Sequence, residues 1–150
     1  LMVFNEANFI KDTIDSILRQ DFTLPYEIII ADNASNDGTS EVVDHILKDY
    51  RNHDIKYHRN QTNIGAIQNY NSLVKKATGK YFILAGGHDL WSTNLLTDLY
   101  HKLENDHTAI LAYSKTVWIN SEGNATGEAD LNYDTSGMTT YKRFITCIYT

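Results

Sequence analysis

The chain has 150 residues, a formal net charge of −6, 42% hydrophobic residues and 21% charged residues. This length is typical of one domain and this composition of a globular one, which excludes a disordered chain. The acidic balance disfavours a nucleic-acid binder, because such a protein needs a basic surface against the phosphates. The single cysteine, Cys147, excludes an internal disulfide and is typical of a reducing compartment.

The hydropathy of the chain predicts its cellular location, and the pattern at its two ends predicts whether it is complete. No apolar run reaches the roughly 20 residues of a membrane span, and no signal peptide is visible. We therefore expect a cytoplasmic protein, either free or held at the cytoplasmic face of a membrane by parts outside this segment. Residues 1–4 read as the tail of a strand and 139–150 as an interrupted amphipathic helix, so we expect a fragment truncated at both ends.

The apolar spacing predicts a regular alternation of strands and helices. Strands are expected near residues 1–4, 26–31, 55–58 and 80–85, with helices between them and after the last, and a longer strand over 109–119. Apart from Glu27, residues 26–31 and 81–85 are continuously apolar, which indicates burial on both faces of a parallel sheet. The fold class is thus α/β: a Rossmann-like, doubly wound, mainly parallel sheet with helices on both faces.

Polar residues follow each predicted strand of the sheet. The segments are 4–6, 32–33, 59–65 and 86–89, and all are rich in Asn, Asp, Glu or Gly. Ligands of open parallel sheets bind beyond the carboxyl ends of the strands. The sequence therefore predicts a site for a polar ligand at this edge.

Asp89 is a candidate metal ligand. It follows a buried strand, and Gly86 and Gly87 before it leave room for a bulky ligand. A carboxylate is a hard oxygen ligand, suited to a divalent cation such as Mg²⁺ or Mn²⁺ on a diphosphate. The alternative is that Asp89 only caps the helix that follows.

Asp32 and Asn33 are candidates for contact with a nucleobase, because they follow the isoleucine-rich strand. The alternative is an Asx-turn in which both side chains bond their own backbone. No histidine pair has the spacing of a zinc site, and His88 matters only as the neighbour of Asp89. No glycine-rich dinucleotide fingerprint or P-loop is present.

Several of these motifs occur in a familiar order. Asn5-Glu6, the run from Glu27 to Thr39, Asn63-Ile64-Gly65 and Gly87-His88-Asp89 together resemble the family 2 glycosyltransferases, which have the GT-A fold. The resemblance covers residues 1 to about 105. It implies a single nucleotide-sugar-binding domain over 1–150, with the start of an acceptor-binding part from about residue 109.

The resemblance also implies roles for individual residues around the nucleotide. Phe4 matches the aromatic residue beside the nucleobase, and Asn33 the residue that contacts the base, with Asp32 before it. Glu6 matches an acidic residue of the donor pocket. Gly65 and Asn71 match residues of the loop and helix that close over the nucleotide.

The metal motif departs from the family pattern. Asp89 matches its last acid, which binds Mg²⁺ or Mn²⁺, but Gly87 and His88 stand where earlier acids are usual. His88 is therefore expected to contact the nucleotide sugar through a hydrogen bond to its phosphates, and the alternative is that it supplies a nitrogen ligand to the metal. The catalytic base is expected outside this fragment, since Glu128 and Asp130 do not align with it.

The implied function is transfer of a sugar from a nucleoside-diphosphate sugar, UDP-linked or similar, to a glycan or lipid-linked acceptor hydroxyl. The resemblance implies an inverting, metal-assisted reaction in polysaccharide or cell-envelope biosynthesis. The alternative is a nucleotide-sugar-binding module without catalysis, which the missing acid favours.

Overall fold

The computed structural model describes residues 1–128, and these fall into two compact units. The first is Leu1–Asp106 and the second begins at His107. Each unit is described by itself. Within the described residues, no helix combines the length and apolarity that crossing a membrane requires.

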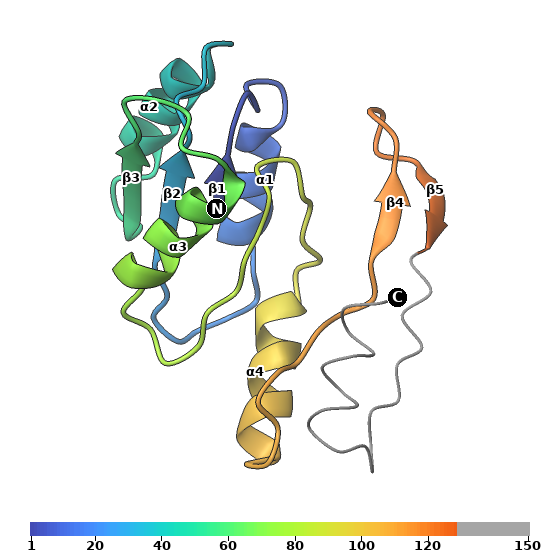
Figure 1. Cartoon of the computed structure of the whole chain (residues 1–150). Coiled ribbons are helices and arrows are strands. Elements are labelled where there is room, and N and C mark those ends of the chain that lie inside the picture. Colours follow the sequence, from blue (N-terminus) through green and yellow to red (C-terminus); the bar gives the residue numbers. More distant parts are fainter. Residues whose placement is uncertain (129–150) are drawn as a thin grey trace. The chain divides into compact units, whose positions relative to one another are not determined.

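The first unit contains a parallel sheet of three strands in the order β1-β2-β3 (Figure 1). The strands are β1 (Met2–Val3), β2 (Ile28–Asp32) and β3 (Ile55–Arg59). Val3 pairs with Asp32, and Asp32 pairs with Arg59, so the three carboxyl ends lie at one edge. All five residues of β2 are buried, which confirms the parallel sheet predicted from its continuous apolarity.

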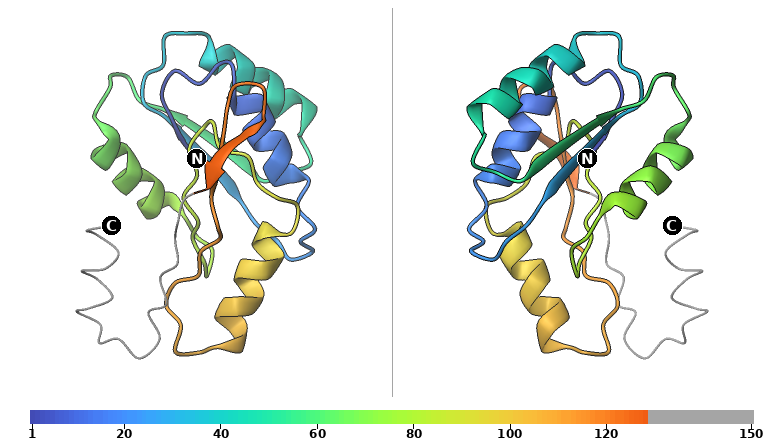
Figure 2. Two further views of the ribbon diagram at one scale, coloured as in Figure 1. Left: turned by 90° about the vertical axis from the view of Figure 1, so that its right-hand side faces the viewer. Right: turned by 90° about the vertical axis from the view of Figure 1, so that its left-hand side faces the viewer.

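Helices cover both faces of this sheet, as predicted. Helices α1 (Ile10–Leu18) and α2 (Thr39–Asp49) lie on one face and α3 (Ala66–Lys76) on the other (Figure 2). Ile10 and Ile14 of α1 and Val43 of α2 are fully buried and pack in one core cluster with β1 and β2. Burial of each isoleucine side chain contributes roughly 1.5–3 kcal/mol to folding.

Helix α4 (Leu95–Asn105) begins beside the end of α1. The Gln20 side chain connects the two, because its Nε2 donates to the Ser92 carbonyl at 2.7 Å and its Oε1 accepts the Leu96 N–H at 3.0 Å. Gln20 thereby binds one of the backbone N–H groups that a helix start leaves free.

The predicted strand at 80–85 is wrong for most of its length. Only the end of the segment pairs with β1: the Met2 N–H donates to the Ala85 carbonyl at 2.9 Å, beside a single bridge between Met2 and Gly86. Tyr81 and Leu84 are 40% and 47% exposed. In this register residues 81–84 lie opposite positions before Leu1, so no residue of the given sequence pairs with them there. Apolarity alone does not make a strand without a partner.

The second unit contains an antiparallel hairpin of β4 (Val117–Ile119) and β5 (Ala125–Glu128). The long strand predicted over 109–119 is therefore confirmed only at its end. The turn between the two strands closes through the Gly123 N–H, which donates to the Asn120 carbonyl at 2.9 Å. The amphipathic helix expected over 139–150 lies outside the described residues.

Candidate functional site

An open pocket lies at the carboxyl edge of β1 and β2, within the first unit. Four segments contribute to its wall: the residues after β1, the end of β2, the start of α3 with the loop before it, and the segment that ends in His88. The lining residues that sequence reasoning had singled out are Phe4, Glu6, Asn33 and His88. The structure thus brings together four candidates that are up to 84 positions apart in the sequence.

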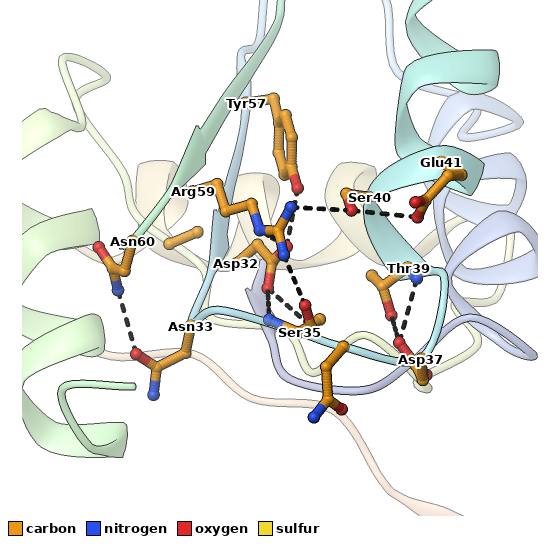
Figure 3. Close-up of polar contacts among 12 residues, drawn as sticks. Asp32, Asn33, Ser35, Asp37, Thr39, Ser40, Glu41, Tyr57, Arg59 and Asn60 are labelled. Atoms are coloured by element: carbon orange, nitrogen blue, oxygen red, sulfur yellow. Dashed lines mark hydrogen bonds and ion pairs between the residues drawn. The ribbon is translucent and has the colours of Figure 1, made fainter. Parts of the chain in front are cut away.

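Asp32 lies behind this pocket rather than in its lining. It is fully buried, and its Oδ1 accepts the backbone N–H of Ser35 at 2.8 Å and the Ser35 hydroxyl at 2.6 Å (Figure 3). Its Oδ2 accepts the Tyr57 hydroxyl at 2.7 Å and lies 3.5 Å from Nε of Arg59. Burial first, and then the hydrogen bond to Asp32, raise the pKa of Tyr57. Asp32 therefore holds the loop after β2 in place, and a ligand contact by Asp32 stays a prediction.

Asn33 is part of a chain of four amides, the amide ladder, formed by Asn33, Asn60, Asn63 and Asn69. The Nδ2 of Asn60 donates to Oδ1 of Asn33 at 3.1 Å and to Oδ1 of Asn69 at 3.0 Å. The Nδ2 of Asn33 donates to Oδ1 of Asn63 at 2.8 Å. These bonds join the end of β2 to the loop before α3 and to α3 itself. The first of them is drawn in Figure 3.

Phe4 and Asn33 lie at corresponding positions of neighbouring strands. Each follows one residue of the pair Val3–Asp32, and the Asn33 N–H donates to the Val3 carbonyl at 2.8 Å. Phe4 is 46% exposed and Asn33 only 4%. An exposed aromatic ring beside a buried amide can stack on a flat base while the amide bonds its edge.

Glu6 and His88 both line the pocket and form a hydrogen-bonded pair. Nδ1 of His88 lies 2.8 Å from Oε1 of Glu6, and this hydrogen bond is the main reason why the pKa of His88 is raised. Gly87 lies against Glu6 so closely that a Cβ there would be 2.8 Å from Glu6 Cγ. Gly87 therefore makes room for the Glu6 side chain. Sequence reasoning had assigned this room to a ligand.

Asp89 closes the tight turn that contains His88. Its Oδ2 accepts the Gly86 N–H at 2.7 Å. The helix that follows begins only at Leu95, with Asn94 as its N-cap, so Asp89 does not cap it. Among residues 1–128, no group of three His, Cys, Asp or Glu side chains is placed to hold a metal ion. Metal binding by Asp89 stays a prediction.

Two further candidates lie on α3 or at its start, and three site residues had no individual role predicted for them. Gly65, with a φ of +83°, precedes α3 next to the pocket, while Asn71 is exposed on α3 and does not line the pocket. Sequence reasoning assigned no individual role to the other members of the amide ladder, of which Asn63 and Asn69 line the pocket. Asn60 and Asn63 belong to the polar segment 59–65, and Asn63 also to a motif of the family resemblance, whereas the only signal for Asn69 was the density of asparagine between residues 60 and 72.

The comparison with protein families identifies the chain. The model of the family described as glycosyl transferase family 2 matches residues 1–146, and the chain belongs to this family. Abequosyltransferase RfbV of Salmonella typhimurium is 35% identical over 103 residues, which are 68% of this chain and 31% of that protein. A glucuronosyltransferase of Methanococcus voltae, whose name gives a dolichyl-linked N-acetylglucosaminyl phosphate as acceptor, is 31% identical over 86 residues, 57% of this chain and 26% of that protein. The chain thus spans about a third or less of these relatives.

Solved structures confirm the GT-A fold. TarS of S. aureus, residues 1–349 in complex with UDP, superposes with a TM-score of 0.63 at 25% identity, over 71% of this chain and 31% of that 1–349 chain. The mannosyltransferase PcManGT of Pyrobaculum calidifontis, in complex with GDP-Man and Mn²⁺, also gives 0.63, at 24% identity over 68% of this chain and 30% of that one.

Proposed function

We propose that this chain is the donor-binding part of an enzyme that transfers a sugar from a nucleoside-diphosphate sugar to an acceptor hydroxyl. The observation that carries the proposal is the pocket itself, whose lining combines an exposed aromatic ring and an amide with a carboxylate–imidazole pair. The ring and the amide are suited to a base, and the carboxylate–imidazole pair is suited to a charged diphosphate. TarS, which shares the fold, binds UDP.

Each part of the pocket has a distinct task in this proposal. Phe4 stacks on the base and Asn33 bonds its edge. His88, whose protonated form Glu6 favours, donates a hydrogen bond to the diphosphate and offsets part of its charge. Glu6 orients the imidazole ring. These contacts hold the sugar-bearing phosphate still, so that an acceptor hydroxyl can approach in line.

A divalent cation is proposed to bind at Asp89, which neighbours the pocket residue His88 but does not itself line the pocket. Asp89 has one carboxylate oxygen, Oδ1, without a hydrogen-bond partner among residues 1–128, while Oδ2 fixes the side chain through the Gly86 N–H. Mg²⁺ and Mn²⁺ sites of this kind need only one or two protein carboxylates, because phosphate and water oxygens complete the coordination. When bound, the cation neutralises charge on the departing diphosphate.

The reaction is proposed to invert the anomeric centre, as the family resemblance implies, with a carboxylate base from the acceptor-binding part. We assign that base to none of the described residues. Glu128 ends β5 in the second unit, and Asp130 lies outside the described residues. The acceptor is proposed to be a glycan or lipid-linked intermediate of cell-envelope polysaccharide synthesis, since the relative from Methanococcus voltae is named for a dolichyl-linked acceptor.

Calorimetry tests the metal-dependent part of this proposal. Nucleoside diphosphate is titrated with and without Mn²⁺ into the parent, Asp89→Asn and, as a control, Asp49→Asn at the exposed end of α2. We expect Mn²⁺ to strengthen nucleotide binding in the parent and the control and to have little effect in Asp89→Asn. Equal affinity with and without Mn²⁺ in the parent contradicts metal assistance.

A second candidate function is a nucleotide-sugar-binding module without catalysis. His88 in place of an acid favours it, because the metal site then carries less negative charge. A donor-hydrolysis assay with Mn²⁺, on the chain together with the acceptor-binding part, separates the two functions: release of free sugar at a rate above that of the unbound donor shows catalysis. Nucleotide binding without such release favours the binding module.

A further inference from the structure

The orientation of the amide groups in the ladder is fixed, because hydrogen bonds with backbone groups determine which atom is nitrogen and which is oxygen in three of its members. The Nδ2 of Asn69 donates to the Ala31 carbonyl at 2.9 Å, which only an N–H group can do. Oδ1 of Asn33 accepts the Ile64 N–H at 2.9 Å, and Oδ1 of Asn63 accepts the Gly65 N–H at 2.9 Å. Exchanging N and O in any of these three amides would place like groups against each other. The placement of donors and acceptors along the ladder is therefore determined.

In this orientation, the carbonyl oxygens of Asn33 and Asn63 are fully paired, whereas some of their N–H groups have no acceptor. Oδ1 of Asn33 accepts from both Asn60 and Ile64. Oδ1 of Asn63 accepts from both Asn33 and Gly65. Each carbonyl oxygen thus has two donors, which is its ordinary capacity. One N–H of Asn33 and both N–H groups of Asn63 have no acceptor within residues 1–128, and both side chains line the pocket.

A base bound against this edge meets N–H groups only. Cytosine presents two adjacent acceptors, N3 and O2, beside the exocyclic amine on its base-pairing edge. Uracil has an N3–H group in the same place, between two carbonyl oxygens. An N–H group opposite another N–H leaves two donors without partners once water is displaced, which is the main source of discrimination in polar sites.

We infer that this pocket selects a cytidine nucleotide over a uridine nucleotide, with Asn33 and Asn63 as the specificity-determining residues. This inference rests on the proposed function, since it concerns the base of the same nucleoside-diphosphate donor. Cytosine and uracil have nearly the same size and shape, so Phe4 stacks on either ring and the difference lies in the hydrogen-bonding edge alone.

A comparison of the affinities of two nucleotides tests the inference directly. The dissociation constants of CDP and UDP are measured by calorimetry on the same protein, with Mn²⁺ at one fixed concentration. We expect CDP to bind on the order of tenfold more tightly, the scale of one mismatched buried hydrogen bond. Equal affinities, or tighter binding of UDP, overturn the inference and leave the proposed function standing. Binding of neither nucleotide also overturns the inference, and a titration with GDP then tests the proposed function separately.

A variant of Asn63 then shows whether the ladder is the cause. Asn63→Asp keeps the oxygen that accepts from Asn33 and Gly65, so every hydrogen bond of Oδ1 survives, and it replaces the free NH₂ by an acceptor. The added charge weakens both nucleotides alike, so the ratio of the two constants is the readout. We expect the preference for CDP to shrink at least severalfold. Asn36→Asp, an exposed position outside the pocket lining, adds the same charge and should leave the ratio unchanged. An unchanged ratio in Asn63→Asp overturns the assignment of specificity to the ladder.

Discussion

Truncation of Asn33 should weaken nucleotide binding much more than truncation of a neighbouring asparagine. Asn33→Ala removes three hydrogen bonds, to the side chains of Asn60 and Asn63 and the N–H of Ile64. Each is worth about 0.5–1.5 kcal/mol net, and their partners in the loop can turn to water, so we expect the free energy of unfolding to fall by roughly 1–3 kcal/mol. Loss of the contact with the base should cost a further 1–2 kcal/mol of binding energy, or about 5- to 30-fold in affinity.

Two measurements on the same samples separate these effects. Urea unfolding gives the loss of stability, and calorimetry with a nucleoside diphosphate gives the affinity of the folded protein. Asn36→Ala is the matched control, because it removes the same side chain from the same loop and no hydrogen bond of the Asn36 side chain is present among residues 1–128. Should Asn33→Ala bind nucleotide as tightly as the parent, Asn33 does not belong to the site and the assignment of the base pocket fails.

Three further predictions concern stability and the shape of the pocket. Tyr57→Phe leaves the buried Oδ2 of Asp32 without its 2.7 Å donor, so urea unfolding should show a loss of about 1–3 kcal/mol; no loss would contradict the supporting role of Asp32. Hydrogen bonds from Lys56 and Thr78 lower the pKa of Glu27 from 4.5 to about 2, so the parent should lose stability as the pH falls from 4.5 toward 2. Glu27→Gln should reduce this dependence in acid titrations followed by circular dichroism, and an unchanged dependence would contradict the role of Glu27. Gly87→Ala should displace Glu6 and cost about 1–3 kcal/mol in unfolding experiments, whereas Gly127→Ala, where a Cβ meets nothing closer than 3.8 Å, should be nearly neutral.

The parts of the fold that could be predicted from the sequence are those with a local signal. Such a signal is present in β2 and in the helices α1 and α2. Continuous apolarity in β2, and apolar residues spaced three and four positions apart in the helices, indicate which faces are buried. The segment 80–85 has the same apolarity as β2, yet only its last residue pairs with β1. Pairing depends on which residues lie opposite in the register, and register is a property of two strands. The hairpin of β4 and β5 was missed for a different reason: β5 has only four residues and shows no alternating apolar pattern.

The candidate site divides along a similar line. That Phe4, Glu6, Asn33 and His88 would share one pocket followed from topology, because the carboxyl ends of parallel strands meet at one edge. The amide ladder did not follow. Its members are ordinary loop and helix asparagines, and what makes them a unit is the direction of each amide, which backbone groups distant in sequence impose. The number of hydrogen-bond donors and acceptors can be counted in the sequence, but only the folded structure shows which of them remain unpaired.

Adjacent positions at the end of β2 illustrate how the fold divides two polar residues between different tasks. Successive side chains of a strand point to opposite faces of its sheet. Asp32 accordingly bonds Ser35 and Tyr57 and lies beside Arg59, which itself donates to Ser40 at the start of α2. Asn33 bonds the loop that leads into α3. A carboxylate suits the first position, because four donors surround it in a buried place, and an amide suits the second, because it both accepts and donates. We expect the hydrogen bonds of Asp32 to restrict movement of the loop after β2, and the proposed discrimination by Asn33 between two bases of equal size requires this restriction.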